Sequence, residues 1–151
     1  MTLHFFGMEA LPFLAADAQR RYPTQRFAAG MAEDSIEIGA DALGRSRFDL
    51  FLASDTLCML LPDMVRRVLT KAGDIAGQVL FRDYLANTSG KISADLPVMF
   101  ELAPRHHHIL FANPYELILR ELGFTDIYYV MEETTEVTVR GSGSFLARRS
   151  D

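Results

Sequence analysis

Apolar residues along this 151-residue chain follow two patterns, short runs typical of strands and longer stretches with helical spacing. The short runs predict strands over residues 3–6, 26–29, 48–53, 78–81, 127–130, 136–139 and 144–148. The helical spacing predicts helices over residues 10–21, from near Pro62 to Lys71, and from Asn113 to Leu122. Strands and helices therefore alternate along most of the chain.

Glycine and proline residues mark where these elements end or begin. Gly7 follows the first predicted strand, and Pro23 stops the first helix. Asn113 is a predicted cap for the last helix, with Pro114 at its first position and Gly123 at its end. The breakers agree with the boundaries that the apolar pattern predicts.

The order of these elements predicts an α/β fold with a mostly parallel sheet. The last two strands have no helix between them, so they predict an antiparallel hairpin through residues 140–143. We expect a loop with a short helical turn over residues 31–47. We expect an irregular excursion over residues 85–112, and long segments of this kind often carry function. We expect one domain over residues 1–151.

Composition narrows the classes of protein to consider. About half of the residues are apolar (49%), which argues against disorder, and the net charge of −5 argues against nucleic acid as a partner. No apolar run reaches the roughly 18 residues of a membrane span. The single cysteine, Cys58, fits a reducing compartment, so we expect a cytoplasmic protein.

Several phrases at compatible spacing make the chain resemble the class I, Rossmann-like methyltransferases that use S-adenosylmethionine. The resemblance runs from about residue 3 to residue 149, and its phrases lie at residues 7–9, 27–34, 48–55, 117–124 and 126–149. It implies that the strands ending near Glu9 and Ala29, and the strand over 48–53, match the second, third and fourth strands of the family. The implied cofactor is S-adenosylmethionine.

The resemblance also implies which residues bind that cofactor. Glu9 would accept hydrogen bonds from the ribose hydroxyls, and the loop with Met31, Ala32 and Glu33 would lie at the adenine. Met31 stands where the family usually has an acidic residue, a role that Glu33 or Asp34 could take. The alternative for Glu9 is a solvated carboxylate favoured by the dipole of the following helix.

Ser54 and Asp55 follow the strand that matches the family's fourth, and the resemblance places them along the methyl donor. The alternative for both is a helix cap, since serine and aspartate are good caps.

The family's first strand and its glycine-rich loop have no counterpart in this sequence. We therefore expect an N-terminally shortened version of the fold, in which the strands matching the second and fourth pair directly, or a partner chain or second copy fills the central position.

Candidate acceptor-binding residues follow the strand over 78–81 and lie in the excursion after it. These are Arg82, Tyr84 and His107, with a local ion pair as the alternative for the arginine. Residues 106–108 are consecutive histidines, whose side chains alternate in direction on an extended segment, so we expect no metal site there. Cys58 lies among apolar neighbours and is expected to be a buried small hydrophobe.

The resemblance thus implies methyl transfer from S-adenosylmethionine, and we expect a small-molecule acceptor rather than protein or RNA. The donor is already activated, so the protein mainly aligns the acceptor and excludes water, and no catalytic residue is assigned. The alternative is a non-catalytic methyltransferase-like module that binds a partner or dimerises.

Overall fold

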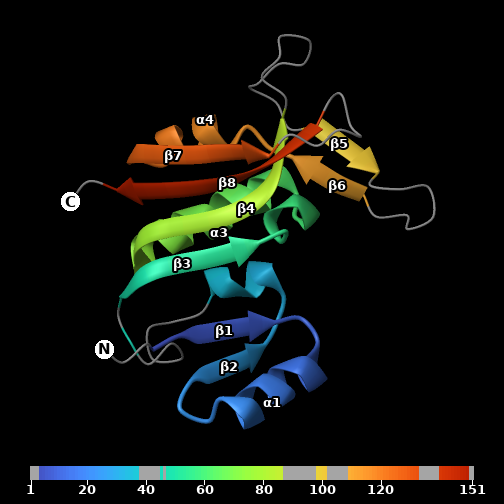
Figure 1. The fold of residues 1–151 in the computed structure, drawn as a ribbon, viewed down its shortest axis with the longest axis vertical. Coiled ribbons are helices and arrows are strands. Elements are labelled where there is room, and N and C mark those ends of the chain that lie inside the picture. The colour runs from blue at the N-terminus through green and yellow to red at the C-terminus, as the bar shows by residue number, and fades with distance from the viewer. Residues whose placement is uncertain are drawn as a thin grey trace. The chain divides into compact units, whose positions relative to one another are not determined.

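The computed structural model describes residues 4–37, 45, 47–86, 98–101, 109–132 and 140–149. The chain divides into two compact units, Met1–Arg47 and Phe48–Asp151. Figure 1 gives the order of the elements, and each unit is described by itself.

The first unit is a β-α-β arrangement. Its elements are β1 (Phe6–Glu9), α1 (Pro12–Arg21), β2 (Arg26–Ala29) and the 3₁₀-helix η1 (Ala32–Ile36). β1 and β2 pair in parallel with Glu9 opposite Ala29, so their carboxyl ends lie side by side. These bounds confirm the predicted helix, the predicted strand over 26–29 and the short helical turn.

The first strand differs from its prediction, because it covers Phe6–Glu9 rather than residues 3–6. Gly7 was expected to end the strand, yet it lies inside it, opposite Phe27. A Cβ atom at Gly7 would lie 2.6 Å from Cδ1 of that ring. The glycine therefore serves close packing of a ring against the strand rather than a turn, which sequence alone does not distinguish.

The second unit is built on a four-stranded sheet. Its elements are β3 (Phe48–Ser54), the 3₁₀-helix η2 (Leu57–Met59), α3 (Pro62–Ile75), β4 (Ala76–Ala86), β5 (Val98–Glu101), β6 (Ile109–Ala112), α4 (Tyr115–Glu121), β7 (Phe124–Glu132) and β8 (Arg140–Arg149). The sheet order is β3-β4-β8-β7. β3 and β4 are parallel, and β8 pairs antiparallel with both β4 and β7. The parallel strands and antiparallel ending are those predicted.

Three local predictions for this unit were wrong. β4 runs five residues beyond the predicted strand, so Arg82–Tyr84 lie within it. The excursion contains an antiparallel pair, β5 with β6, because apolar runs at 98–100 and 109–111 pair across the intervening residues. Residues 140–143 belong to β8 and pair with β4 rather than forming a turn. The predicted strand over 136–139 lies outside the described residues.

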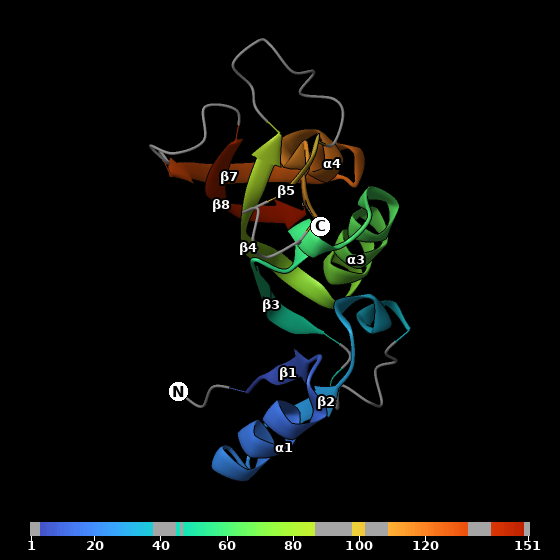
Figure 2. The same cartoon turned by 90° about the vertical axis from the view of Figure 1, so that its right-hand side faces the viewer.

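Helices α3 and α4 lie on one face of the four-stranded sheet, as Figure 2 shows. α3 begins at Pro62 as predicted, whereas the N-cap of α4 is Pro114 rather than Asn113. The core between helices and sheet is apolar and almost fully buried, and includes Val65, Leu69, Val79, Phe81, Tyr115, Leu119, Phe145 and Ala147. Within this unit's sheet, β3 is an edge strand. The predicted pairing of a partner chain beside it stays a prediction.

No helix within the described segments is long and apolar enough to cross a membrane.

Gly123 ends α4 with φ of 82°, in the left-handed region that favours glycine. Replacing it with alanine is expected to lower the free energy of unfolding by about 1–2 kcal/mol because of backbone strain alone, since a Cβ atom there meets nothing within 4 Å. Gly77→Ala is the matched control, because its Cβ would make only ordinary contact, at 3.7 Å from a backbone oxygen. Urea denaturation of both variants measures the difference, and equal losses would contradict the explanation.

Candidate functional site

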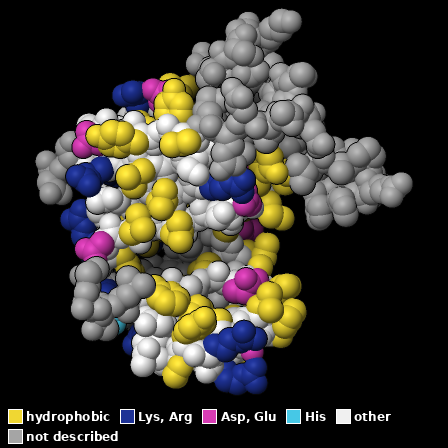
Figure 3. Space-filling view, viewed as in Figure 1, with side chains coloured by type: hydrophobic (Ala, Val, Ile, Leu, Met, Phe, Trp, Pro, Cys, Tyr) yellow, Lys and Arg dark blue, Asp and Glu magenta, His cyan; other side chains and the backbone are white. Residues whose placement is uncertain are grey.

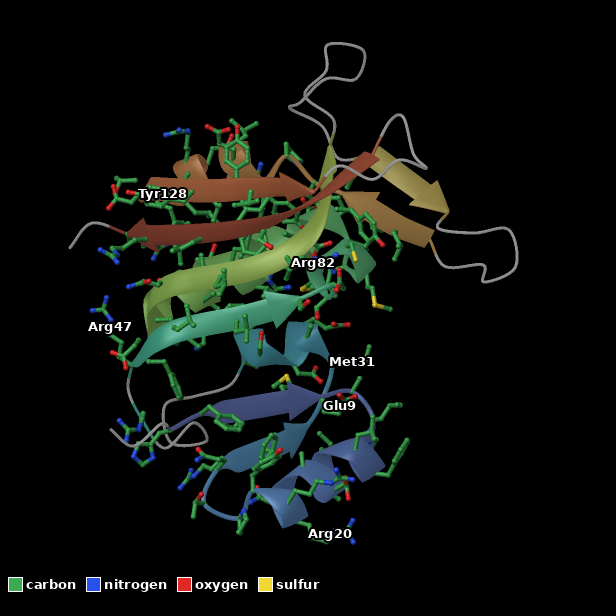
Figure 4. All side chains as sticks on the ribbon, in the orientation of Figure 1. Glu9, Arg20, Met31, Arg47, Arg82 and Tyr128 are labelled. Atoms are coloured by element: carbon green, nitrogen blue, oxygen red, sulfur yellow. The ribbon has the colours of Figure 1, made fainter. Side chains whose placement is uncertain are left out.

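Glu9 is the last residue of β1, at the carboxyl end of the two parallel strands of the first unit (Figure 4). Its Oε1 accepts a hydrogen bond of 3.0 Å from the backbone N–H of Leu11, the N-cap residue of α1. Among the described residues, no group donates a hydrogen bond to the other carboxylate oxygen, Oε2. The carboxylate therefore holds the start of the helix with one oxygen and can accept a ligand's hydroxyl with the other.

The loop after β2 lies against the same end of the strands. The backbone N–H of Gly30 donates to the carbonyl of Glu9 over 3.0 Å. The Asp34 carboxylate accepts the N–H of Met31 at 2.7 Å, and the Asp34 N–H donates back to the Met31 carbonyl at 3.0 Å. The structure thus brings Glu9 together with the predicted loop, and Asp34 is used in shaping that loop.

The Glu33 side chain in this loop has an unsatisfied carboxylate oxygen. Its Oε2 is buried and, among the described residues, has no hydrogen-bond partner. A buried acceptor without a donor is costly, so this oxygen is a position that an added hydrogen-bond donor would stabilise. Beside Glu33 in sequence, Met31 is 52% exposed and Ala32 is half-buried.

Ser54 and Asp55 close β3 in the second unit, and neither caps a helix. The N-cap residues of η2 and α3 are Thr56 and Leu61. Asp55 has φ of 51°, which costs backbone energy in a residue other than glycine. Its N–H donates to the Arg82 carbonyl at 2.8 Å, and the Ser54 hydroxyl donates to its carboxylate at 3.1 Å. The helix-cap alternative is therefore wrong, and the strained turn marks a candidate site.

Arg82 lies on β4 beside this turn, where Figure 4 labels it. Its guanidinium contacts both carboxylate oxygens of Asp55, at 3.1 and 3.3 Å. The ion-pair alternative is thus correct, with Asp55 as a partner. Burial, with the Asp55 charge, raises the pKa of the half-buried Tyr84, which keeps its phenol protonated. His107 lies outside the described residues.

Sequence reasoning missed the role of Asp83, which is fully buried. Its carboxylate accepts N–H groups from Cys58 at 2.9 Å and from Tyr84 at 2.7 Å. Burial raises the pKa of this carboxyl group, and these N–H bonds act against the shift. The sequence did contain a signal for this burial. Alternate residues of a strand point to the same face, and Asp83 alternates with Val79 and Phe81, which are both buried in the core. The carboxylate connects β4 to η2, the 3₁₀-helix that follows Ser54 and Asp55.

Cys58 is buried against Leu110 and Ala112, as predicted for a small hydrophobe. Burial and the neighbouring Asp83 charge raise the pKa of its thiol, so it is not a reactive thiolate. Asn113 donates to the Tyr115 hydroxyl at 3.3 Å, and its buried Oδ1 has no hydrogen-bond partner in the described part of the chain.

Among the described residues, no group of three or more His, Cys, Asp or Glu side chains could hold a metal ion. The histidines at 106–108 fall outside those residues, so the expectation of no metal site there stays a prediction.

No family model matches the sequence, and no curated protein matches it either. Solved structures do match. The N-terminal domain of EvdMO1 with SAH bound aligns with 96% of this chain and 64% of its own, with a TM-score of 0.70 and 12% identity. A Burkholderia thailandensis 1,6-didemethyltoxoflavin-N1-methyltransferase, with that compound and S-adenosylhomocysteine bound, aligns with 97% of this chain and 61% of its own, with a TM-score of 0.63 and 20% identity.

A third structure, a SAM-dependent methyltransferase from Methanosarcina mazei, aligns with 98% of this chain and 83% of its own, with a TM-score of 0.65 and 13% identity. This chain spans somewhat less than two thirds of the first two structures. These likenesses confirm the predicted α/β architecture. The fold of this chain is that of the class I SAM-dependent methyltransferases.

Proposed function

We propose that this chain binds S-adenosylmethionine and takes part in methyl transfer to a small-molecule acceptor. The observation that carries the proposal is the pair of glutamates in the first unit. Glu9 and Glu33 follow two parallel strands at their carboxyl ends, where α/β proteins bind ligands, and each has an oxygen without a partner in the described residues.

We assign the donor groups of an adenosine to these two acceptors. Two ribose hydroxyls match the unshared Oε2 of Glu9, and the exocyclic amine of adenine matches the buried Oε2 of Glu33. Met31 and Ala32 offer apolar surface for the base. The cofactor, when bound, supplies an activated methyl group. The roles of Ser54 and Asp55 along the methyl donor stay a prediction.

The second unit offers groups for an acceptor. Arg82, held by the Asp55 carboxylate, presents a fixed positive charge, and Tyr84 presents a protonated phenol. Such groups orient a polar acceptor and exclude water from it, which is most of what methyl transfer from an activated donor requires. Small-molecule acceptors of the solved neighbours, such as 1,6-didemethyltoxoflavin, agree in class with this proposal.

Isothermal titration with S-adenosylhomocysteine tests the proposal through Glu9→Gln. The glutamine can still accept the Leu11 N–H, so the helix start is kept, but one acceptor oxygen becomes a donor. We expect micromolar binding to the unchanged chain and about 10- to 100-fold weaker binding to the variant, since hydrogen bonds to charged groups contribute about 1.5–3 kcal/mol.

Glu33→Gln should weaken binding similarly, whereas Glu37→Gln, an exposed carboxylate just after η1, should leave it unchanged. Equal affinities for all four proteins would contradict the assignment of Glu9 and Glu33. Absence of binding to the unchanged chain at millimolar ligand would instead favour the non-catalytic, partner-binding alternative.

A further inference from the structure

The second unit leaves one face of its four-stranded sheet without a helix among the described residues. Both α3 and α4 lie on the opposite face, as Figures 1 and 2 show. Figure 3, which views the bare face, shows hydrophobic side chains gathered over these strands. A monomeric soluble protein seldom exposes a large contiguous apolar patch without a binding role.

The strand register defines this bare face. Residues directly opposite each other on neighbouring strands share a face, so one row crosses all four strands: Leu52, Leu80, Leu146 and Tyr128. Leu52 is 67% exposed and Tyr128 is 68% exposed. Both side chains would be buried if another layer packed on this face of the sheet. The row is an apolar band across the whole width of the sheet.

Two flanking rows carry the polar groups. One contains Leu50, Gln78, Arg148 and Asp126, and the other contains Ser54, Arg82, Ser144 and Val130. Arg148 lies opposite Asp126, and Arg82 is paired with Asp55. Each flank therefore holds both signs of charge, which allows the same surface to meet itself without an unbalanced like charge.

We propose that this face is the interface for a second copy of the chain, packed sheet on sheet. With strands about 4.8 Å apart and about 3.3 Å per residue, four strands and the seven residues of β3 present about 19 by 23 Å. A single helix, about 10 Å across, covers only half of that width.

A second identical sheet covers all of it, and lays one apolar band against the other at the usual spacing of about 10 Å. Both copies together bury on the order of 1,000 Å², the size at which specific interfaces begin. The contact is isologous, so it closes as a dimer rather than growing into a fibre. Its modest area implies a reversible dimer.

Light scattering coupled to size-exclusion chromatography tests the proposal on the full chain. We expect a mass of twice 17.0 kDa at high micromolar concentration, falling toward one chain on dilution. Leu52→Lys and Val130→Lys, both highly exposed positions on the face, should weaken self-association at least tenfold. Leu61→Lys is the matched control: it is also 67% exposed but lies at the start of α3, and it should leave the dimer intact.

Hydroxyl-radical footprinting of the unchanged chain tests the same face without a substitution. Tyr128 should be protected at the concentration where the dimer forms, whereas Tyr22, 55% exposed in the first unit, should react equally at all concentrations. A single-chain mass at every concentration, or a dimer that persists in both face variants with Tyr128 unprotected, would overturn the proposal. Either result leaves the cofactor titration unaffected, so the two proposals fail separately.

Discussion

Replacing Phe81 with alanine is expected to lower the free energy of unfolding of the second unit by about 3–5 kcal/mol. Phe81 is 1% exposed, and its ring centre lies 4.8 Å from that of Tyr115 and 5.0 Å from that of Phe145. Truncation removes one ring of this aromatic cluster and leaves a cavity that the rigid sheet and α4 fill only in part. Urea denaturation followed by circular dichroism measures the loss.

Leu61→Ala is the control for truncation itself, because that side chain is 67% exposed. It should change the free energy of unfolding by no more than about 0.5 kcal/mol. A loss below about 1 kcal/mol for Phe81→Ala would mean that the aromatic cluster is not the core of the second unit.

The buried carboxyl group of Asp83 is expected to make stability fall as the pH rises. Burial raises its pKa in the folded chain above the ordinary 3.8, so the folded state binds the proton more tightly than the unfolded state. Its contribution is therefore complete below about pH 4 and is lost as the pH passes through the raised pKa.

Asp83→Asn isolates this contribution, since an amide of the same shape does not titrate and still accepts one N–H. The measurement is the free energy of unfolding of both proteins between pH 4 and pH 8, taken as a difference so that the other titrating groups cancel. We expect the unchanged chain to lose stability relative to the variant as the pH rises. The expectation would be contradicted if this difference in the free energy of unfolding stayed constant, or if it shifted in favour of the unchanged chain as the pH rises. Either result would mean that ionising Asp83 does not destabilise the fold.

Local signals in the sequence were sufficient for elements whose pattern has a single interpretation. The helical spacing before Pro23 gave α1, and Pro62 gave the start of α3, because proline fits only the first turn of a helix. The apolar run at 48–53 gave β3. These predictions succeed since steric and hydrophobic preferences act on the segment itself.

Other features depend on contacts between distant segments, and there the sequence was insufficient. Gly7 resembles a breaker until Phe27 is seen to lie across it, and Arg82–Tyr84 resemble a loop until β8 pairs with them. The antiparallel pair of β5 and β6 likewise forms only through partners in another run. Tertiary pairing overrides local polarity in each of these cases.

Some features of the candidate site could also be predicted from local sequence, whereas others depend on the fold. Glu9 was predicted from its place after a strand, and the structure puts it beside the predicted loop. The unpartnered oxygen of Glu33 and the burial of Asp83 depend on the fold around each carboxylate, which no local pattern encodes. Asp55 was a candidate by position, but its left-handed backbone and its contact with Arg82 became visible only in three dimensions.

Titration of the ¹⁵N-labelled chain with S-adenosylhomocysteine, followed by amide NMR spectra, tests the central claim most directly because it reports both binding and place. The claim predicts saturable chemical-shift changes that are largest at Leu11, whose N–H donates to the Glu9 carboxylate, and at residues 31–34. Unchanged spectra at saturating ligand, or shifts that spare both of these segments, would contradict it.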